Sequence, residues 1–189
     1  MGAAGAGWLD RSEREREEQP DKALDLIGIR PGLVVADVGA GTGYMTLRIA
    51  KRVGETGRVY ANDIQPEMLE KLAENARLQN LNNIEPVLGA EGDAKLPAGK
   101  VDLAILVDVY HEFSRPQEML QSIRRSLKPS GRLVLLEYKK EDPSIPIRPD
   151  HKMSVYDIKT EVEAEGFKLD KVIDSLGRQH IAIFRKLTM

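Results

Sequence analysis

The sequence contains no cysteine among its 189 residues. This absence excludes disulfide bonds, thiolate metal sites and thiol nucleophiles, and it fits a reducing compartment. Long apolar runs are missing as well: the longest uninterrupted one, Leu103 to Val107, is far shorter than the ~20 residues that a membrane-spanning helix needs. Residues 1–7 do not resemble a secretory signal, because they have no basic start and no long apolar stretch. We therefore expect a cytoplasmic protein that does not bind membranes.

An excess of charge of one sign is also lacking. The 28 Lys and Arg residues nearly balance the 30 Asp and Glu residues, which gives a net charge of −2. No overall field draws such a chain to nucleic acid, so nucleic acid is disfavoured as a partner, although local basic patches stay open. The length predicts one domain that buries about 70% of its unfolded-chain surface. The composition leaves the oligomeric state open.

Strand and helix signals alternate between residues 33 and 138, which is the pattern of a mostly parallel sheet covered by helices on both faces. Strands are expected at residues 33–37, 58–63, 84–88, 102–108 and 132–138, and helices after Gly43, from Pro66 and from Pro116.

The C-terminal segment departs from this alternation. Strands are expected at residues 167–173 and 180–184, and the connection between them is too short for a parallel crossover, so they must pair as an antiparallel hairpin. Before them, Ser154 and Asp157 resemble a capping box at the start of a helix. The sequence thus predicts an α/β fold, a doubly wound, mostly parallel seven-stranded sheet that ends in an antiparallel hairpin.

Residues 1–30 precede the main domain, which we expect to span residues 31–189. Charges of both signs alternate over Asp10 to Glu18, and the simplest interpretation is a helix whose charged side chains form an exposed face of weak ion pairs. The alternative is a lid over an acceptor site, with Trp8 and Leu9 as an apolar handle that closes over a substrate.

A glycine-rich turn follows the first expected strand, in the run Asp37-Val38-Gly39-Ala40-Gly41-Thr42-Gly43. Its glycines let the backbone approach a ligand closely, and the start of the next helix supplies N–H donors. A dinucleotide fingerprint would carry its third glycine at position 44, which is tyrosine. A nicotinamide dehydrogenase is therefore the weaker alternative for this turn.

The spelling D-x-G-x-G-x-G resembles the first motif of the class I S-adenosylmethionine-dependent methyltransferases, in particular their small-molecule, UbiE-like branch. The resemblance covers roughly Pro20 to the C-terminus, and that family's sheet also ends in an antiparallel hairpin. It implies that Asp37 lies beside the ammonium group of S-adenosylmethionine, that Asp63 accepts the ribose hydroxyls and that Ile64 packs on the adenine. The cofactor-binding residues that it implies are Asp37, Gly39, Ala40, Gly41, Asp63, Ile64, Gly92, Asp93, Ala94 and Asp108.

Methyl transfer needs little from a protein beyond alignment of the acceptor and exclusion of water, because the sulfonium is already activated. An uncharged hydroxyl or an ammonium must also lose a proton to a base. The expected base is His111, which follows the fourth strand at the ligand-binding edge of the sheet, and the alternative is a structural hydrogen bond in that loop. No metal is expected, because Arg115 stands where an H-E-x-x-H motif would need its second histidine.

The acceptor is expected to be a small molecule. The loop after the fourth strand lacks the Asn/Asp-Pro-Pro-Tyr/Phe motif of enzymes that methylate adenine or glutamine amide nitrogen. The absence of cysteine argues against arsenite as the acceptor. Only the N-terminal helices, residues 110–115 and residues 142–152 are placed to build an acceptor pocket. An RNA or protein methyltransferase and a non-catalytic cofactor-binding module stay as alternatives.

Overall fold

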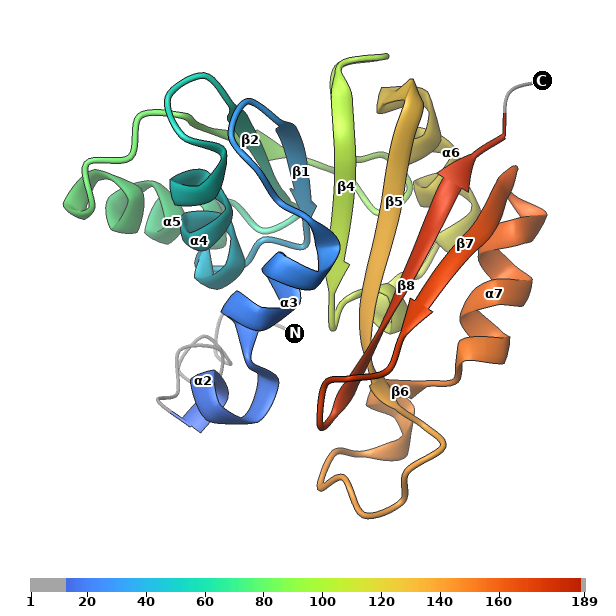
Figure 1. Cartoon of the computed structure of the whole chain (residues 1–189). Coiled ribbons are helices and arrows are strands. Elements are labelled where there is room, and N and C mark those ends of the chain that lie inside the picture. Colours follow the sequence, from blue (N-terminus) through green and yellow to red (C-terminus); the bar gives the residue numbers. More distant parts are fainter. Residues whose placement is uncertain (1–12, 188–189) are drawn as a thin grey trace.

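The computed structural model describes residues 13–187, which form one eight-stranded sheet with helices on both faces (Figure 1). The strands are β1 (Val34–Val38), β2 (Arg58–Asp63), β3 (Ile84–Leu88), β4 (Val101–Val107), β5 (Leu127–Lys139), β6 (Lys152–Met153), β7 (Phe167–Ile173) and β8 (Gln179–Lys186). The helices are α2 (Glu13–Glu18), α3 (Pro20–Ile27), α4 (Tyr44–Val53), α5 (Pro66–Leu78), α6 (Pro116–Ser126) and α7 (Val155–Ala164), with short 3₁₀ turns η2 (Tyr110–Glu112) and η3 (Pro149–His151).

The strand order is β3-β2-β1-β4-β5-β8-β7, and the order reverses between β1 and β4. Strands β1 to β5 pair in parallel, whereas β8 runs antiparallel to both β5 and β7. The predicted parallel sheet and C-terminal hairpin are therefore confirmed. In open sheets of this kind, ligands bind outside the carboxyl ends of the strands at the reversal point, which here is the edge shared by β1 and β4.

The sheet has eight strands and not the seven that were predicted. The additional strand, β6, consists of Lys152 and Met153, which pair in parallel with Tyr138 and Lys139 of β5. A two-residue strand is too short to show the alternation of apolar and polar residues by which strands are predicted.

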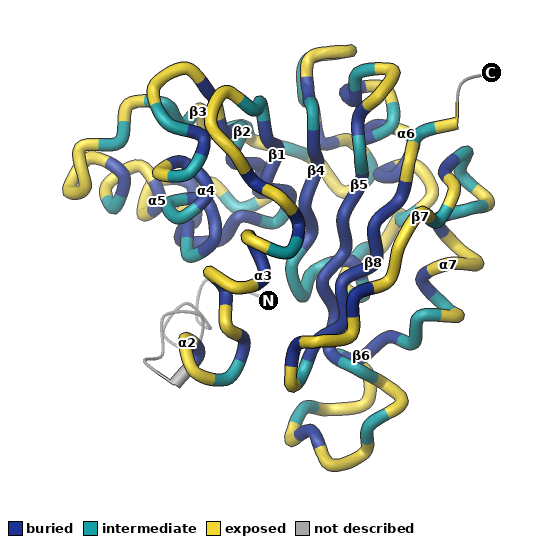
Figure 2. Tube along the Cα trace, viewed as in Figure 1, coloured by how far each residue is buried: buried dark blue, intermediate teal, exposed yellow. Residues whose placement is uncertain are grey.

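Two apolar layers enclose the sheet, because successive strand residues point to opposite faces. Val35 and its neighbours on one face pack against α3 and α4, and Ala36 and its neighbours on the other face pack against α6 and α7. The central strands are accordingly buried along most of their length (Figure 2). Among the described residues, no helix is both long and apolar enough to cross a membrane.

The N-terminal helices are not the solvated pieces that charge alternation indicates. Arg14 and Glu18, spaced i and i+4, lie on one side of α2 and are 5% and 4% exposed. Arg14 Nε donates to Glu18 Oε2 at 2.6 Å, and the hydroxyl of Tyr138, at the end of β5, donates to Glu18 Oε1 at 2.8 Å. The expected exposed face is therefore wrong for these two residues, because β5 ends where α2 lies. Trp8 and Leu9 are outside the described residues.

Candidate functional site

A cavity of about 470 Å³ opens at the predicted edge of the sheet. Its volume is in the range of small-molecule sites. Helix α2, the ends of β1, β2, β4 and β5, and the loops after β4 and β5 contribute to its wall, so the structure brings together the three segments expected to form an acceptor pocket. The wall includes Arg14, Gly39, Gly41, Asp63, Ile64, Asp108, His111, Glu112, Ile147 and His151.

The glycine-rich turn is fastened to the end of β2. The backbone N–H groups of Gly39 and Ala40 both donate to the Asn62 carbonyl at 2.9 Å, and Gly41 N–H donates to Asp63 Oδ2 at 2.9 Å. Gly39 has a φ of 79°, and a Cβ there would lie 2.5 Å from Val109 Cγ2, so only glycine fits between β1 and the loop after β4. Gly39 and Gly41 line the cavity, whereas Ala40 is buried beneath the turn.

Asp63 and Ile64 both line the cavity. The two Asp63 oxygens accept the Gly41 N–H and, at 3.0 Å, the Gln65 N–H, which fixes the carboxylate and leaves further lone pairs for ligand hydroxyls. Ile64 is 50% exposed beside it and offers an apolar surface. The neighbouring Asn62, which sequence analysis missed, donates to the carbonyls of Val87 and Ala94 and so joins the end of β2 to β3 and to the loop after β3.

Asp37 lies beneath the glycine turn and is not part of the cavity wall. It is 2% exposed, and its Oδ2 accepts the Thr46 hydroxyl at 2.6 Å, which ties β1 to the first turn of α4. Burial raises the pKa of Asp37 to about 6. Its direct contact with a cofactor stays a prediction.

None of the three residues Gly92, Asp93 and Ala94 lines the main cavity. Gly92 and Asp93 border a separate depression, and Ala94 is buried. Asp93 Oδ1 accepts the Ser122 hydroxyl at 2.6 Å and the Lys95 N–H at 2.9 Å. The Ala94 N–H donates to the Ser122 hydroxyl oxygen at 3.1 Å. Asp93 and Ala94, which were predicted to bind the cofactor, are thus engaged with Ser122 of α6 in this structure, and their cofactor contacts stay a prediction.

Asp108 follows β4 with a φ of 51° and lines the cavity. Its Oδ2 accepts Gln179 Nε2–H at 2.8 Å, whereas its buried Oδ1 has no hydrogen-bond partner within residues 13–187. Burial and the nearby Glu18 and Glu137 carboxylates raise the pKa of Asp108 well above its usual range.

His111 is held by a buried carboxylate that sequence analysis missed. Its Nδ1 lies 2.7 Å from Glu137 Oε2, and the other Glu137 oxygen accepts the Tyr110 N–H at 2.9 Å. Glu137 is fully buried in β5. Burial alone would lower the pKa of His111, but the Glu137 hydrogen bond and charge outweigh it, and the pKa is raised.

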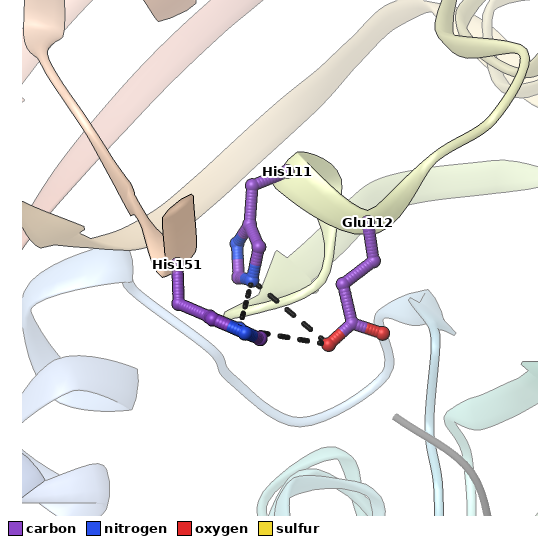
Figure 3. A group of neighbouring side chains, drawn as sticks. All are labelled: His111, Glu112 and His151. Atoms are coloured by element: carbon purple, nitrogen blue, oxygen red, sulfur yellow. Dashed lines mark hydrogen bonds and ion pairs between the residues drawn. The ribbon is translucent and has the colours of Figure 1, made fainter. Parts of the chain in front are cut away.

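His151 is the second residue at this site that was missed. Its Nδ1 lies 3.1 Å from His111 Nε2, and the two rings meet edge to face. Glu112 lies on the other side of the pair, with its Oε1 3.9 Å from His111 Nε2 (Figure 3). Glu137 could have been identified from the sequence, because it is an acidic residue directly after the apolar run Leu133–Leu136. No local pattern in the sequence indicates that His151 lies next to His111.

Comparisons with known proteins identify the family of the chain. The family model described as a methyltransferase domain matches residues 29–175. The ubiquinone/menaquinone biosynthesis C-methyltransferase UbiE of Hydrogenovibrio crunogenus is 36% identical over 121 residues, which is 62% of this chain and 47% of that protein. The UbiE protein of Escherichia fergusonii is 33% identical over 118 residues, with the same coverage. The chain thus spans about half the length of these curated relatives.

Among solved structures, an S-adenosylmethionine-dependent methyltransferase from Aquifex aeolicus superposes with a TM-score of 0.93 and 28% identity, covering 99% of this chain and 100% of that one. The family match also confirms the prediction of S-adenosylmethionine as cofactor. By its glycine turn, its strand order and the family model that spans most of its length, this chain belongs to the methyltransferase domain family.

Proposed function

We propose that this protein transfers the methyl group of S-adenosylmethionine to a small-molecule acceptor with an acidic hydroxyl. One observation carries the proposal. The Glu137–His111 pair opens into the same cavity as Asp63 and the glycine turn, so a proton acceptor and a cofactor site share one enclosed space. A non-catalytic cofactor-binding module would not need a buried carboxylate behind that histidine.

The cofactor is proposed to lie along the carboxyl ends of β1, β2 and β4. Asp63 accepts the ribose hydroxyls, Ile64 packs on the adenine, and Gly39 and Gly41 give the close backbone approach. Asp108 lines the cavity whereas Asp37 lies beneath the turn, so Asp108 is the better placed carboxylate for the cofactor's ammonium group.

In the proposed reaction, a hydroxyl of the acceptor gives its proton to the His111–His151 pair, and Glu137 stabilises the imidazolium that forms. The resulting anion directs an electron pair to the methyl carbon. The new bond to that carbon forms as the carbon–sulfur bond breaks, which leaves neutral S-adenosylhomocysteine. If the nucleophilic atom is a ring carbon, the imidazolium returns its proton to the acceptor oxygen, and the neutral imidazole then takes the proton from that ring carbon, which restores the aromatic system.

The named activity of the UbiE relatives supports a phenol or quinol acceptor methylated on carbon. We propose a small molecule and not RNA or protein, because the chain has a net charge of −2 and the cavity holds about 470 Å³.

The absence of cysteine supports a cytoplasmic location. Residues 1–30 are proposed to act as an acceptor-site lid over the catalytic domain at residues 31–189, since Arg14 lines the cavity.

Titration calorimetry tests the cofactor site. S-adenosylhomocysteine is expected to bind in the micromolar range, roughly −8 kcal/mol, and NAD is expected not to bind. Replacing Asp63 by alanine should weaken S-adenosylhomocysteine about 10- to 100-fold, because the ribose hydroxyls lose a charged acceptor. Glu67→Gln, which removes a charge from an exposed position of α5 outside the cavity, is the control. A preference for NAD, or an unchanged affinity in Asp63→Ala, contradicts the assignment.

A further inference from the structure

We propose that His111, Glu112 and His151 form a binding site for one divalent transition-metal ion of the zinc type. The three donor atoms, His111 Nε2, His151 Nδ1 and Glu112 Oε1, lie within 4.8 Å of one another at the cavity wall. They point toward a common centre from two separate segments, η2 and η3 (Figure 3). Two imidazoles and a carboxylate are a donor set typical of Zn²⁺ sites with an open coordination position.

The distances are close to those that a tetrahedral ion requires. Two nitrogens that each lie about 2.0–2.1 Å from zinc are roughly 3.3 Å apart, and the two imidazole nitrogens here are 3.1 Å apart. The Glu112 oxygen lies 3.9 Å from His111 Nε2 and 4.0 Å from His151 Nδ1, so it must move inward by about half an ångström or more. Binding of an ion would draw the Glu112 side chain, which is 26% exposed, toward the two imidazoles.

A buried carboxylate lies behind the His111 imidazole, in the position that orients metal-binding histidines. A histidine ligand commonly donates its second N–H to a carboxylate, which fixes its tautomer and ring orientation. Glu137, fully buried, accepts from His111 Nδ1 at 2.7 Å and thereby leaves the Nε2 lone pair directed at the proposed ion. On the other ring, Asp150 Oδ2 lies 3.8 Å from His151 Nε2. That separation is too long for a hydrogen bond, and the Asp150 carboxylate accepts instead from Arg148 at 3.1 and 2.7 Å. The carboxylate that orients a ring by a hydrogen bond is therefore Glu137, behind His111.

Sequence spacing gives no indication of this site, because His151 comes from the loop after β5, far along the chain from His111. An ion bound there and a proton taken up by His111 compete for the same Nε2 lone pair. The metal site itself does not rest on the proposed methyl transfer, because an ion can be bound and measured without cofactor or acceptor.

Titration of the metal-free full-length chain with Co²⁺ tests the proposal. We expect one ion per chain, with the visible absorption bands of four- or five-coordinate Co²⁺, and displacement of the ion by Zn²⁺. His151→Ala should abolish the bands and weaken binding more than 100-fold, and Glu112→Gln should weaken it at least tenfold. Glu137→Gln should weaken binding about 10- to 100-fold, as expected for a residue that orients a ligand.

Glu91→Gln is the matched control, because it removes a carboxylate that lines the same cavity but is not a proposed ligand. It should bind Co²⁺ as the parent does. Circular dichroism of each variant establishes that it is folded, and Glu112→Gln, at a partly exposed side chain, serves if His151→Ala does not fold. The proposal is overturned if the parent shows no saturable site, or if both folded ligand variants bind Co²⁺ as tightly as the parent does.

Discussion

Replacing His111 by alanine is expected to lower kcat by about 10²- to 10⁴-fold, the range that a general base contributes. The affinity for S-adenosylhomocysteine should stay within a few-fold of the parent value, because Asp63 and the glycine turn remain in place. The measurement is steady-state kinetics on whichever small phenol or quinol the parent methylates fastest. A turnover within a few-fold of the parent would leave alignment and water exclusion as the whole mechanism.

The pH profile separates a base from a structural histidine. Burial lowers the pKa of His111, but the Glu137 hydrogen bond and charge outweigh burial, and the pKa is raised overall. The imidazole can therefore accept a proton only at a pH above this raised value. The acidic limb of kcat should therefore lie above the ordinary histidine pKa of about 6.5. In Glu137→Gln the charge is lost, and the limb should move to lower pH. A limb that stays in place shows that His111 does not set it.

Replacing Asp37 by asparagine is expected to raise the free energy of unfolding at neutral pH. Burial raises the pKa of Asp37 from 3.8 to about 6, so the folded state binds this proton more tightly than the unfolded state. The stability that this group contributes is full below pH 3.8 and is lost as the pH rises through about 6. By about pH 8 the loss amounts to roughly 3 kcal/mol.

Asparagine cannot ionise, and its amide oxygen can still accept the Thr46 hydroxyl. Urea unfolding should show the Asp37→Asn variant to be more stable than the parent by up to about 3 kcal/mol near pH 8, and not near pH 4. Asp93→Asn is a control with the opposite expected sign. The Ser122 hydrogen bond lowers the pKa of Asp93, so loss of the Asp93 charge should destabilise the protein at neutral pH. A stability difference that does not vary with pH would contradict the role given to Asp37.

The fold was predictable because its signals are local. The apolar runs of the central strands, the glycines at 39, 41 and 43, and the short connection before β8 each restrict the chain within a few residues. Strand β6 could not be predicted in this way, because Lys152 and Met153 join the sheet only through their pairing with β5.

Less of the site was predictable, because only some of its residues are marked by a local pattern in the sequence. Asp63, Ile64 and His111 were found because each follows a strand at the edge where such sheets bind ligands. Their partners come from distant segments: Glu137 reaches His111 across neighbouring strands, and His151 arrives from a loop. The burial of Glu18 depends likewise on Tyr138, more than a hundred residues away.

Glu137 and Tyr138 are consecutive residues of β5 that point to opposite faces of the sheet, one toward His111 and the other toward Glu18 of α2. A shift of register by one residue would exchange their faces and undo both contacts at once. The end of this strand is therefore intolerant of insertions and deletions, since either change would disturb the proton acceptor and the N-terminal helix together.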